Sequence, residues 1–268
     1  MKLYAGLAIL GGMAALALLA PGLMGHDPFL PDLFNRYAAP SAVHWLGTDD
    51  LGRDVLLRLL HGARVSLAVG LGAALMALLV GGLAGVLAAW AGGVTDAVIM
   101  RLADALLALP ALPLLVVLSA LDPAMIGLPR GEAGADILRI ATILAAFGWV
   151  GVARLARSAA LSVLAADFCR AARALGVSEF RLLWRHVLPQ LVTPLAVATA
   201  LAVGGAILAE SALSFLGLGI APPAASWGNM LANAQEAVFV APLVALWPGL
   251  AILLAVAGCS LVADGLRR

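Results

Sequence analysis

Long uninterrupted blocks of apolar residues, separated by shorter polar segments, set the fold class of this chain. The hydrophobic runs fall at about residues 3–24, 65–91, 103–121, 137–155, 189–210 and 241–263. A helix rises about 1.5 Å per residue, so about 20 residues cross the roughly 30 Å hydrocarbon core of a bilayer. The pattern therefore predicts an all-α polytopic membrane protein with about six transmembrane helices.

Two details of the apolar runs bear on packing. Pro110 and Pro113 interrupt the third run, which makes it the least regular, although membrane helices tolerate proline where neighbours satisfy the freed carbonyls. In the second run, Gly81 and Gly85 form a GxxxG pair, a spacing that lets two helices approach closely.

The first run could be mistaken for a signal peptide. It follows Lys2 and carries no charge as far as Met24, whereas the apolar core of a signal peptide is usually about 7–15 residues long. We expect a retained first helix, with cleavage as the alternative.

Composition supports the membrane interpretation and excludes several kinds of chemistry. Hydrophobic residues make up 63% of the chain and charged residues 12%, against about 25% charged in soluble domains. The net charge of +1 does not suggest a nucleic-acid partner. Cys169 and Cys259 form no CxxC motif, and the four histidines have no metal-ligand spacing. We expect no catalytic, cofactor-binding or metal site, and no phosphate-binding GxxxxGK[ST] motif occurs.

The distribution of basic residues predicts the orientation. With both termini in the cytoplasm, ten arginines and lysines lie inside and six outside, the direction of the positive-inside rule. In this arrangement residues 92–100 and 156–188 are cytoplasmic, and residues 25–64, 122–136 and 211–240 are external.

The cytoplasmic segment LSVLAADFCRAARALGVSEFRLLWRHVLPQL has the pattern of a helix–turn–helix. Gly176 is suited to end a first helix, and Ser178 to cap a second one that carries Glu179 in its first turn. The second helix has an apolar side, including Phe180, and a basic side, and Pro189 is suited to begin the next span. The segment is either a docking element for another protein or a basic loop lying on anionic lipid.

Two external segments are dense in turn residues. In HWLGTDDLGRDVLLRLLHGARVS, Thr48 or Asp49 is suited to cap an amphipathic helix at the membrane surface, although a plain connector is the alternative. In ESALSFLGLGIAPPAASWGNML, glycines permit a tight turn before a Pro-Pro pair. Asp104, Glu210 and Asp264 lie near predicted span ends, so solvation at a helix end is at least as good an interpretation as a functional site.

These motifs resemble one family. The cytoplasmic segment is similar to the EAA loop of ATP-binding-cassette (ABC) importer permeases, with matches at Ala171, Ala172, Gly176, Leu188 and Pro189. Arg170 stands where that pattern has Glu. The external GTDDLGRD and ESALSFLGLG segments, with WVGVARLAR at 149–157, resemble the C-type permease subunits of dipeptide, oligopeptide and nickel importers. The resemblance extends from about residue 44 to 266.

The resemblance implies a type I permease fold and a set of functional positions. It divides the chain into an N-terminal helix with an external amphipathic segment (1–64) and a permease core (65–268) with its coupling loop at 156–188. It implies that coupling to the ATPase involves Ala171, Ala172, Ala174, Leu175, Gly176, Val177, Ser178, Phe180 and Pro189. It implies that external contacts to a partner permease or binding protein involve Gly47, Thr48, Asp49, Gly52, Arg53, Asp54, Phe215, Gly217, Gly219 and Trp227.

The resemblance also implies partners and a function. The expected assembly, in contact with lipid in the bacterial cytoplasmic membrane, combines this chain with a second permease, two ATP-binding subunits and a solute-binding protein. ATP and Mg²⁺ would bind to the ATP-binding subunits, so this chain itself is expected not to be an enzyme. The expected cargo is a dipeptide or oligopeptide, with nickel, a glutathione-like compound or another small solute as the alternative. A less favoured alternative is an ion-coupled secondary transporter.

Overall fold

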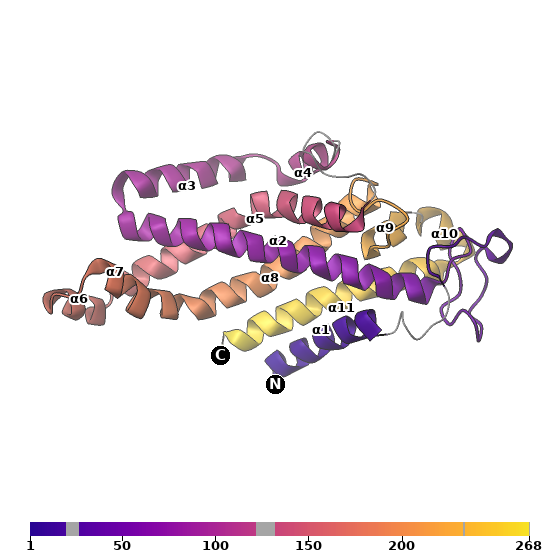
Figure 1. Ribbon diagram of the computed structural model, residues 1–268, viewed down its shortest axis with the longest axis horizontal. Coiled ribbons are helices and arrows are strands. Elements are labelled where there is room, and N and C mark those ends of the chain that lie inside the picture. Colours follow the sequence, from indigo (N-terminus) through magenta and orange to yellow (C-terminus); the bar gives the residue numbers. More distant parts are fainter. Residues whose placement is uncertain (20–26, 122–131, 233, 268) are drawn as a thin grey trace.

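The computed structural model describes residues 1–19, 27–121, 132–232 and 234–267, and helices are its regular elements (Figure 1). No strand occurs within these ranges, so the predicted all-α class is confirmed. The α-helices are α1 (Lys2–Leu19), α2 (Val55–Ala91), α3 (Gly93–Ala108), α4 (Ala111–Ser119), α5 (Ala133–Leu164), α6 (Asp167–Ala174), α7 (Glu179–Leu182), α8 (Leu188–Phe215), α9 (Trp227–Ala232), α10 (Ala234–Val240) and α11 (Pro242–Leu266). A 3₁₀ turn, η2 (Leu33–Asn35), and a π-helical turn, η4 (Leu183–Val187), complete the set.

Five helical segments have the length and apolar composition needed to cross a membrane. They are α1, α2, α5, α11 and the helical run Glu179–Phe215, which joins α7, η4 and α8. α3 and α4 pass the same test as a pair bent by 85°, which would make a sixth span. The prediction of about six spans is therefore confirmed, and the third predicted span is the bent one.

The bend between α3 and α4 follows from the local sequence. Pro110 restricts the residue before it to extended backbone, and Leu109 accordingly has ψ 140°. Pro113 lies in the first turn of α4, where an N–H group would have no partner within the helix. The interruption expected from these prolines is confirmed.

Several predicted boundaries were wrong. Residues 92–100 were expected to be a connection, but Gly92 and Gly93, with φ 61° and 51°, make the reversal and α3 begins at Gly93. The separate surface helix expected from Thr48 or Asp49 does not form, because α2 begins at Val55 and continues to Ala91. The boundary predicted at residue 64 therefore falls inside α2. Residues 20–24 of the first predicted span and 122–131 of the second external segment lie outside the described residues.

The GxxxG pair on α2 makes the close contact predicted for it. A Cβ atom at Gly81 would collide with the carbonyl oxygen of Trp149, and one at Gly85 with that of Ala153, both on α5. Because the two backbones approach closely over this length, α2 and α5 form the central pair of the bundle, with α8 packed beside them (Figure 1).

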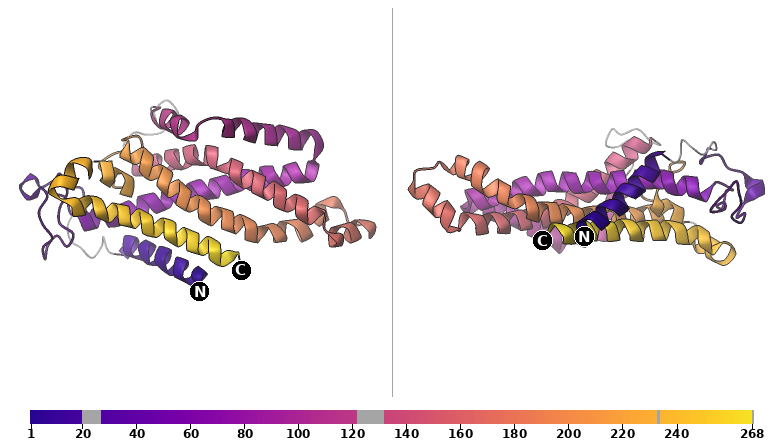
Figure 2. Two further views of the ribbon diagram at one scale, coloured as in Figure 1. Left: turned by 180° about the vertical axis from the view of Figure 1, so that it is seen from behind. Right: turned by 90° about the horizontal axis from the view of Figure 1, so that it is seen from below.

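The first and last helices pack against each other along one side of the bundle (Figure 2). A Cβ atom at Gly6 would meet Gly258 and Val262 of α11, and one at Gly265 would meet Leu3 of α1. Lys2 Nζ lies 2.9 Å from a carboxylate oxygen of Asp264. Both termini consequently lie together, near the middle of the long axis of the molecule, at the ends of α1 and α11 that face the side of α6 and α7 (Figures 1 and 2).

The bundle therefore has two different ends. One carries the turn at Gly92 and the segment 167–187, which we call the hairpin (Figure 1). The other carries residues 27–54, which we call the N-terminal loop, together with α9 and α10 (Figure 1). The residues singled out in the sequence divide between these two ends.

Candidate functional site

The hairpin turns at Gly176 through a Schellman motif. Gly176 has φ +81°, and its N–H donates to the carbonyl of Arg173 at 2.9 Å. The N–H of Val177 donates to the carbonyl of Ala172 at 3.1 Å. These two bonds end α6 as predicted, and the positive φ is the reason for glycine at this position.

The two arms of the hairpin enclose a small core. Cys169, Ala172 and Leu182 are buried, and Val177 and the end of α5 pack against them. This core fixes the hairpin on α5. Cys169 is a buried free thiol and packs as a small apolar residue.

The outer surface of the hairpin carries several large apolar side chains beside exposed arginines. Leu175 is 85% exposed, Phe180 64% and Trp184 61%, with Phe168 nearby in sequence at 46%. The rings of Phe180 and Trp184 lie 6.2 Å apart between centroids. Large apolar side chains presented together in this way mark an interaction surface. Of the other predicted coupling residues, Ala171, Ala174, Ser178 and Pro189 are exposed, Val177 is half-buried and Ala172 is buried.

Ion pairs hold the hairpin on its polar side. Arg173 Nε donates to Glu179 at 2.8 Å, which joins the end of α6 to the start of α7 and raises the pKa of Arg173. Arg170, at the position where Glu was expected, pairs with Asp167 within α6 at 2.9 Å. Ser178 precedes α7 as predicted, but its side chain makes no capping bond.

The path from the hairpin into the bundle is continuous helix. Pro189 was expected to begin a new span. It does lie in the first turn of α8, but α8 follows η4 without a break, so the span has already begun before Pro189. A proline ring clashes with the carbonyl of the residue four positions earlier, here Arg185, and the wider π turn accommodates it. The second arm of the hairpin and α8 thus belong to one helical run, Glu179–Phe215.

At the opposite end, the GTDDLGRD motif builds a tightly bonded turn. Asp49 accepts bonds from the N–H groups of Leu51 and Arg53 at 2.9 Å each and from Arg53 Nε at 2.8 Å. Asp54, rather than Thr48 or Asp49, caps α2 by accepting from the N–H of Leu57 at 2.8 Å. The helix therefore starts later than predicted, because Asp49 is engaged within the turn.

The rest of the motif fixes the N-terminal loop. Thr48 donates to the carbonyl of Asn35 and accepts from the N–H of Ala38. Gly47 and Gly52 have φ +78° and +74°, and a Cβ atom on Gly52 would collide with the carbonyl of Asp32. Thr48, Asp49 and Asp54 are buried, so these predicted contact residues act first on the fold of the loop itself.

The second external motif follows α8. Gly217, with φ +76°, ends α8 in another Schellman motif, in which the N–H of Leu218 donates to the carbonyl of Leu213 at 2.9 Å. Gly219 is packed against Ser214, and Phe215 is 38% exposed. Trp227 is fully buried and its Nε1 donates to the carbonyl of Leu59 at 3.1 Å, so it anchors α9 on α2.

A buried polar cluster at this end was missed in the sequence. Glu210 is 0% exposed and accepts from Ser66 at 3.0 Å and from Ser214 at 2.6 Å. Ser66 also accepts from the N–H of Trp227, so α2, α8 and α9 meet at Glu210. Of the two interpretations of Glu210, solvation at a helix end is excluded, because the chain continues past it and covers it. The serine four residues after Glu210 was the available signal.

Two ion pairs tie α3 to α5 near the hairpin end. Asp96 pairs with Arg157, and Asp104 with Arg154, whose side chain is 48% exposed. The side chain of Asp104 is itself 56% exposed. It is therefore a surface group, in agreement with the interpretation that it is solvated at a helix end. Within the described ranges, no group of His, Cys, Asp and Glu is arranged to hold a metal ion.

Comparison with known proteins identifies the family. Residues 77–268 match the family described as binding-protein-dependent transport system inner membrane component. The chain belongs to this family. It is thus a multi-pass permease subunit of an ABC importer, which works with partner subunits, and the resemblance found in the sequence is confirmed.

Individual relatives match this permease over nearly its whole length. The oligopeptide transport system permease protein OppC of Bacillus subtilis is 36% identical over 98% of this chain and 82% of that protein. The glutathione transport system permease protein GsiD of Pectobacterium atrosepticum is 36% identical over 95% of this chain and 81% of that protein. The dipeptide transport system permease protein DppC of Alkalihalophilus pseudofirmus is 37% identical over 98% of this chain and 83% of that protein.

Proposed function

We propose that this permease forms, with a second permease subunit, the translocation path of an ABC importer that carries peptides across the bacterial cytoplasmic membrane. Relatives named for oligopeptide and dipeptide transport, each covering nearly the whole chain, support the peptide cargo. The relative named for glutathione transport supports a small peptide in particular. The family match favours this importer over an ion-coupled secondary transporter.

The observation that carries the proposal is the exposed apolar surface of the hairpin in a member of this family. Leu175, Phe180 and Trp184 form part of a compact, bonded element instead of a disordered loop. A fixed element with unpaired apolar side chains suits a protein partner better than it suits lipid headgroups. The partner that the proposal assigns to this surface is an ATP-binding subunit, and two such subunits serve the permease pair.

The geometry supports a mechanical role for the hairpin. Its core is fixed to the end of α5, and its second arm continues without a break into α8. When ATP closes the ATP-binding subunits, the hairpins move with them, and α5 and α8 of the two permeases rotate. The path between the permeases then opens to the other side of the membrane.

The proposal fixes an orientation. The hairpin and the turn at Gly92 lie at one end of the bundle, and the ends of α1 and α11 that carry the termini face this end (Figure 2). The excess of basic residues in its loops assigns this end to the cytoplasm. The N-terminal loop, α9 and α10 then face the outside. They are the surface available to the solute-binding protein, which delivers the cargo.

The coupling role is tested at Gly176, where a substitution changes the backbone conformation without creating a steric clash. A Cβ atom there meets no other atom within 4 Å, but φ is +81°. Gly176→Val should distort the turn and reduce ATP-dependent, vanadate-sensitive peptide uptake at least about tenfold, whereas Gly176→Asn should retain most uptake because Asn tolerates this conformation. Insertion into the membrane should be normal for both. Full uptake by Gly176→Val would count against the coupling role.

The cargo is tested by competition. Uptake of a labelled dipeptide by the reconstituted importer should be blocked by unlabelled dipeptides and oligopeptides and unaffected by a nickel chelate. Inhibition by the nickel chelate with no inhibition by peptides would replace the peptide assignment with nickel.

A further inference from the structure

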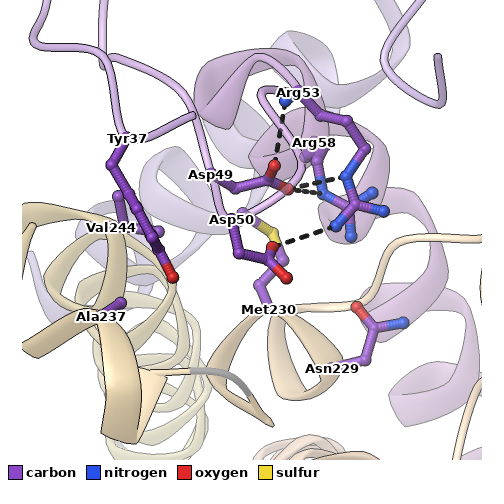
Figure 3. A pocket seen from close by; sticks show the side chains of 9 residues that line it. All are labelled: Tyr37, Asp49, Asp50, Arg53, Arg58, Asn229, Met230, Ala237 and Val244. Atoms are coloured by element: carbon purple, nitrogen blue, oxygen red, sulfur yellow. Dashed lines mark hydrogen bonds and ion pairs between the residues drawn. The ribbon is translucent and has the colours of Figure 1, made fainter. Parts of the chain in front are cut away.

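A small pocket lies at the proposed outer end, between the N-terminal loop, α9, α10 and α11 (Figure 3). We call it the Arg58 pocket. It is lined by Tyr37, Asp49, Asp50, Arg53, Arg58, Asn229, Met230, Ala237 and Val244. Two stretches that are distant in sequence, residues 37–58 of the N-terminal loop and the start of α2 and residues 229–244 of α9, α10 and α11, thus meet at a cluster of charged and polar groups.

The side chain of Arg58 is the unusual group in this pocket. It is 5% exposed, and its Nε lies 3.2 Å from a carboxylate oxygen of Asp49. Its Nη1 is buried and meets no hydrogen-bond acceptor among the described residues. A buried charged donor without an acceptor is costly, and native proteins seldom retain one without a reason. Nη1 is therefore a donor positioned for an acceptor from another molecule.

The size of the pocket limits what can enter. Its volume is about 30 Å³, and one water-sized group needs about 10–15 Å³. One or two heavy atoms fit, whereas a free amino acid or a peptide does not. The entering group is consequently the tip of something larger, which excludes enclosure of the transported peptide here.

The charges of the pocket determine the kind of acceptor. Asp49 is engaged by three N–H groups of the turn as well as by Arg58, and Asp50 lies 3.4 Å from Arg53 Nη2. The two carboxylates balance the two guanidinium groups. A third carboxylate would meet two like charges, which repel it. A neutral carbonyl oxygen accepts from Nη1 without that repulsion.

The surroundings indicate a protein partner. The segments that form the pocket also carry large exposed apolar side chains, with Phe34 in the N-terminal loop fully exposed and Phe239 of α10 91% exposed. Trp45 of the N-terminal loop is 63% exposed. A small desolvated polar pocket among exposed aromatic side chains has the anatomy of an interface hot spot.

We propose that the Arg58 pocket receives a neutral carbonyl oxygen, from the main chain or an amide side chain, of the solute-binding protein, and that Arg58 Nη1 donates to it. This inference rests on the proposed function, which places this end outside the membrane. Docking would then take place at the junction of the N-terminal loop with α9 and α11, and α9 is also joined to α2 and α8 through the Glu210 cluster.

The test measures binding of the purified solute-binding protein to the complete importer in nanodiscs. Arg58→Lys keeps a positive charge beside Asp49 and removes Nη1, and Ala237→Leu fills the pocket without touching its ion pairs. Each should weaken binding about tenfold or more, since a hydrogen bond to a charged group is lost. The matched control is Arg101→Lys, the same substitution at an exposed site on α3, and it should bind normally.

The outcomes separate this inference from the proposed function. If both pocket variants assemble and bind the solute-binding protein as tightly as the wild type, the pocket holds only buried water and the inference is wrong. It is equally wrong if the variants lose the second permease subunit instead, because that subunit would then be the occupant. Should Arg58→Lys not fold, Ala237→Leu decides alone. If the wild-type chain recruits no ATP-binding subunit or solute-binding protein, the proposed function itself fails.

Discussion

The two ends of the permease use charged residues in opposite ways. At the hairpin, Arg173 and Glu179 pair with 39% and 51% of their side chains exposed. In the turn that starts the bundle at the other end, Arg53 and Asp49 pair with 11% and 9% exposed. An exposed pair adds little to stability, whereas breaking a buried one leaves an uncompensated charge.

Large apolar side chains are exposed at both ends, as Phe34 and Phe239 are at the end opposite the hairpin, and the two ends differ in what they bury. The hairpin exposes Leu175, Phe180 and Trp184 around a core of a few small side chains, while Trp227 at the other end is fully buried. The hairpin is thus a lightly stabilised element that presents a surface. The turn at the opposite end is rigid and buries its motif residues. The family match, residues 77–268, includes the hairpin and leaves out the N-terminal loop.

The largest effect should come from the buried turn. Asp49→Ala removes the partner of Arg53 and Arg58, both largely buried, and should lower the free energy of unfolding by about 3–5 kcal/mol. Thermal unfolding of the purified permease in detergent would measure this loss. Asp27→Ala, an exposed acidic residue of the same loop, is the control. If Asp49→Ala lowers the stability no more than Asp27→Ala does, the ion pairs of the turn contribute nothing to stability.

At the hairpin, the large effect should be on assembly instead of stability. Trp184→Ala should weaken binding of the ATP-binding subunits by about 2 kcal/mol, roughly 30-fold, because exposed aromatic side chains are typical interface anchors. Binding is measured by titration of purified ATP-binding subunits onto the nanodisc-embedded permease, with the melting temperature as control. A fall in melting temperature with unchanged binding would reverse this assignment.

The same glycine substitution should separate the two ends. Gly52→Ala forces a Cβ atom into the carbonyl of Asp32, whereas Gly176→Ala meets open space and only the unfavourable φ. We expect Gly176→Ala to cost about 1 kcal/mol of stability and Gly52→Ala clearly more. Comparison of the two melting temperatures tests this, and equal shifts would show that backbone conformation alone matters at both turns.

The smallest effect should follow removal of the exposed ion pair. Glu179→Ala breaks the pair with Arg173 but leaves the buried contacts of Cys169 and Leu182 intact. The melting temperature should be almost unchanged because water screens both groups. A shift as large as that of Asp49→Ala would remove the contrast between the two ends.

Local signals in the sequence were sufficient for the elements of this permease. Runs of about 20 apolar residues predict spans because a bilayer sets their length. Gly176 predicts a helix end and Gly217 a tight turn because glycine readily adopts positive φ, and Gly81 with Gly85 predicts a close helix contact. The prolines of the third span predicted its bend. Each of these signals acts within a few residues.

Other features were wrong or missed because they depend on contacts between distant segments. The start of α2 could not be placed from its own residues, since Asp49 is engaged by the turn and Asp54 is the cap. Pro189 looked like a helix start because no sequence signal indicated the π turn before it.

What the sequence determined by itself is the class of the molecule: a chain too apolar for water, a helix length set by the bilayer, and motifs sufficient for the family. Only the tertiary structure decided which charged side chains are buried and which apolar side chains stay exposed. Glu210 and Arg58 are buried because segments as far away as α9 fold over them. Leu175 and Trp184 stay exposed because this chain supplies nothing within the described residues to cover them. Burial is a property of the whole packed bundle, so no local pattern of residues encodes it.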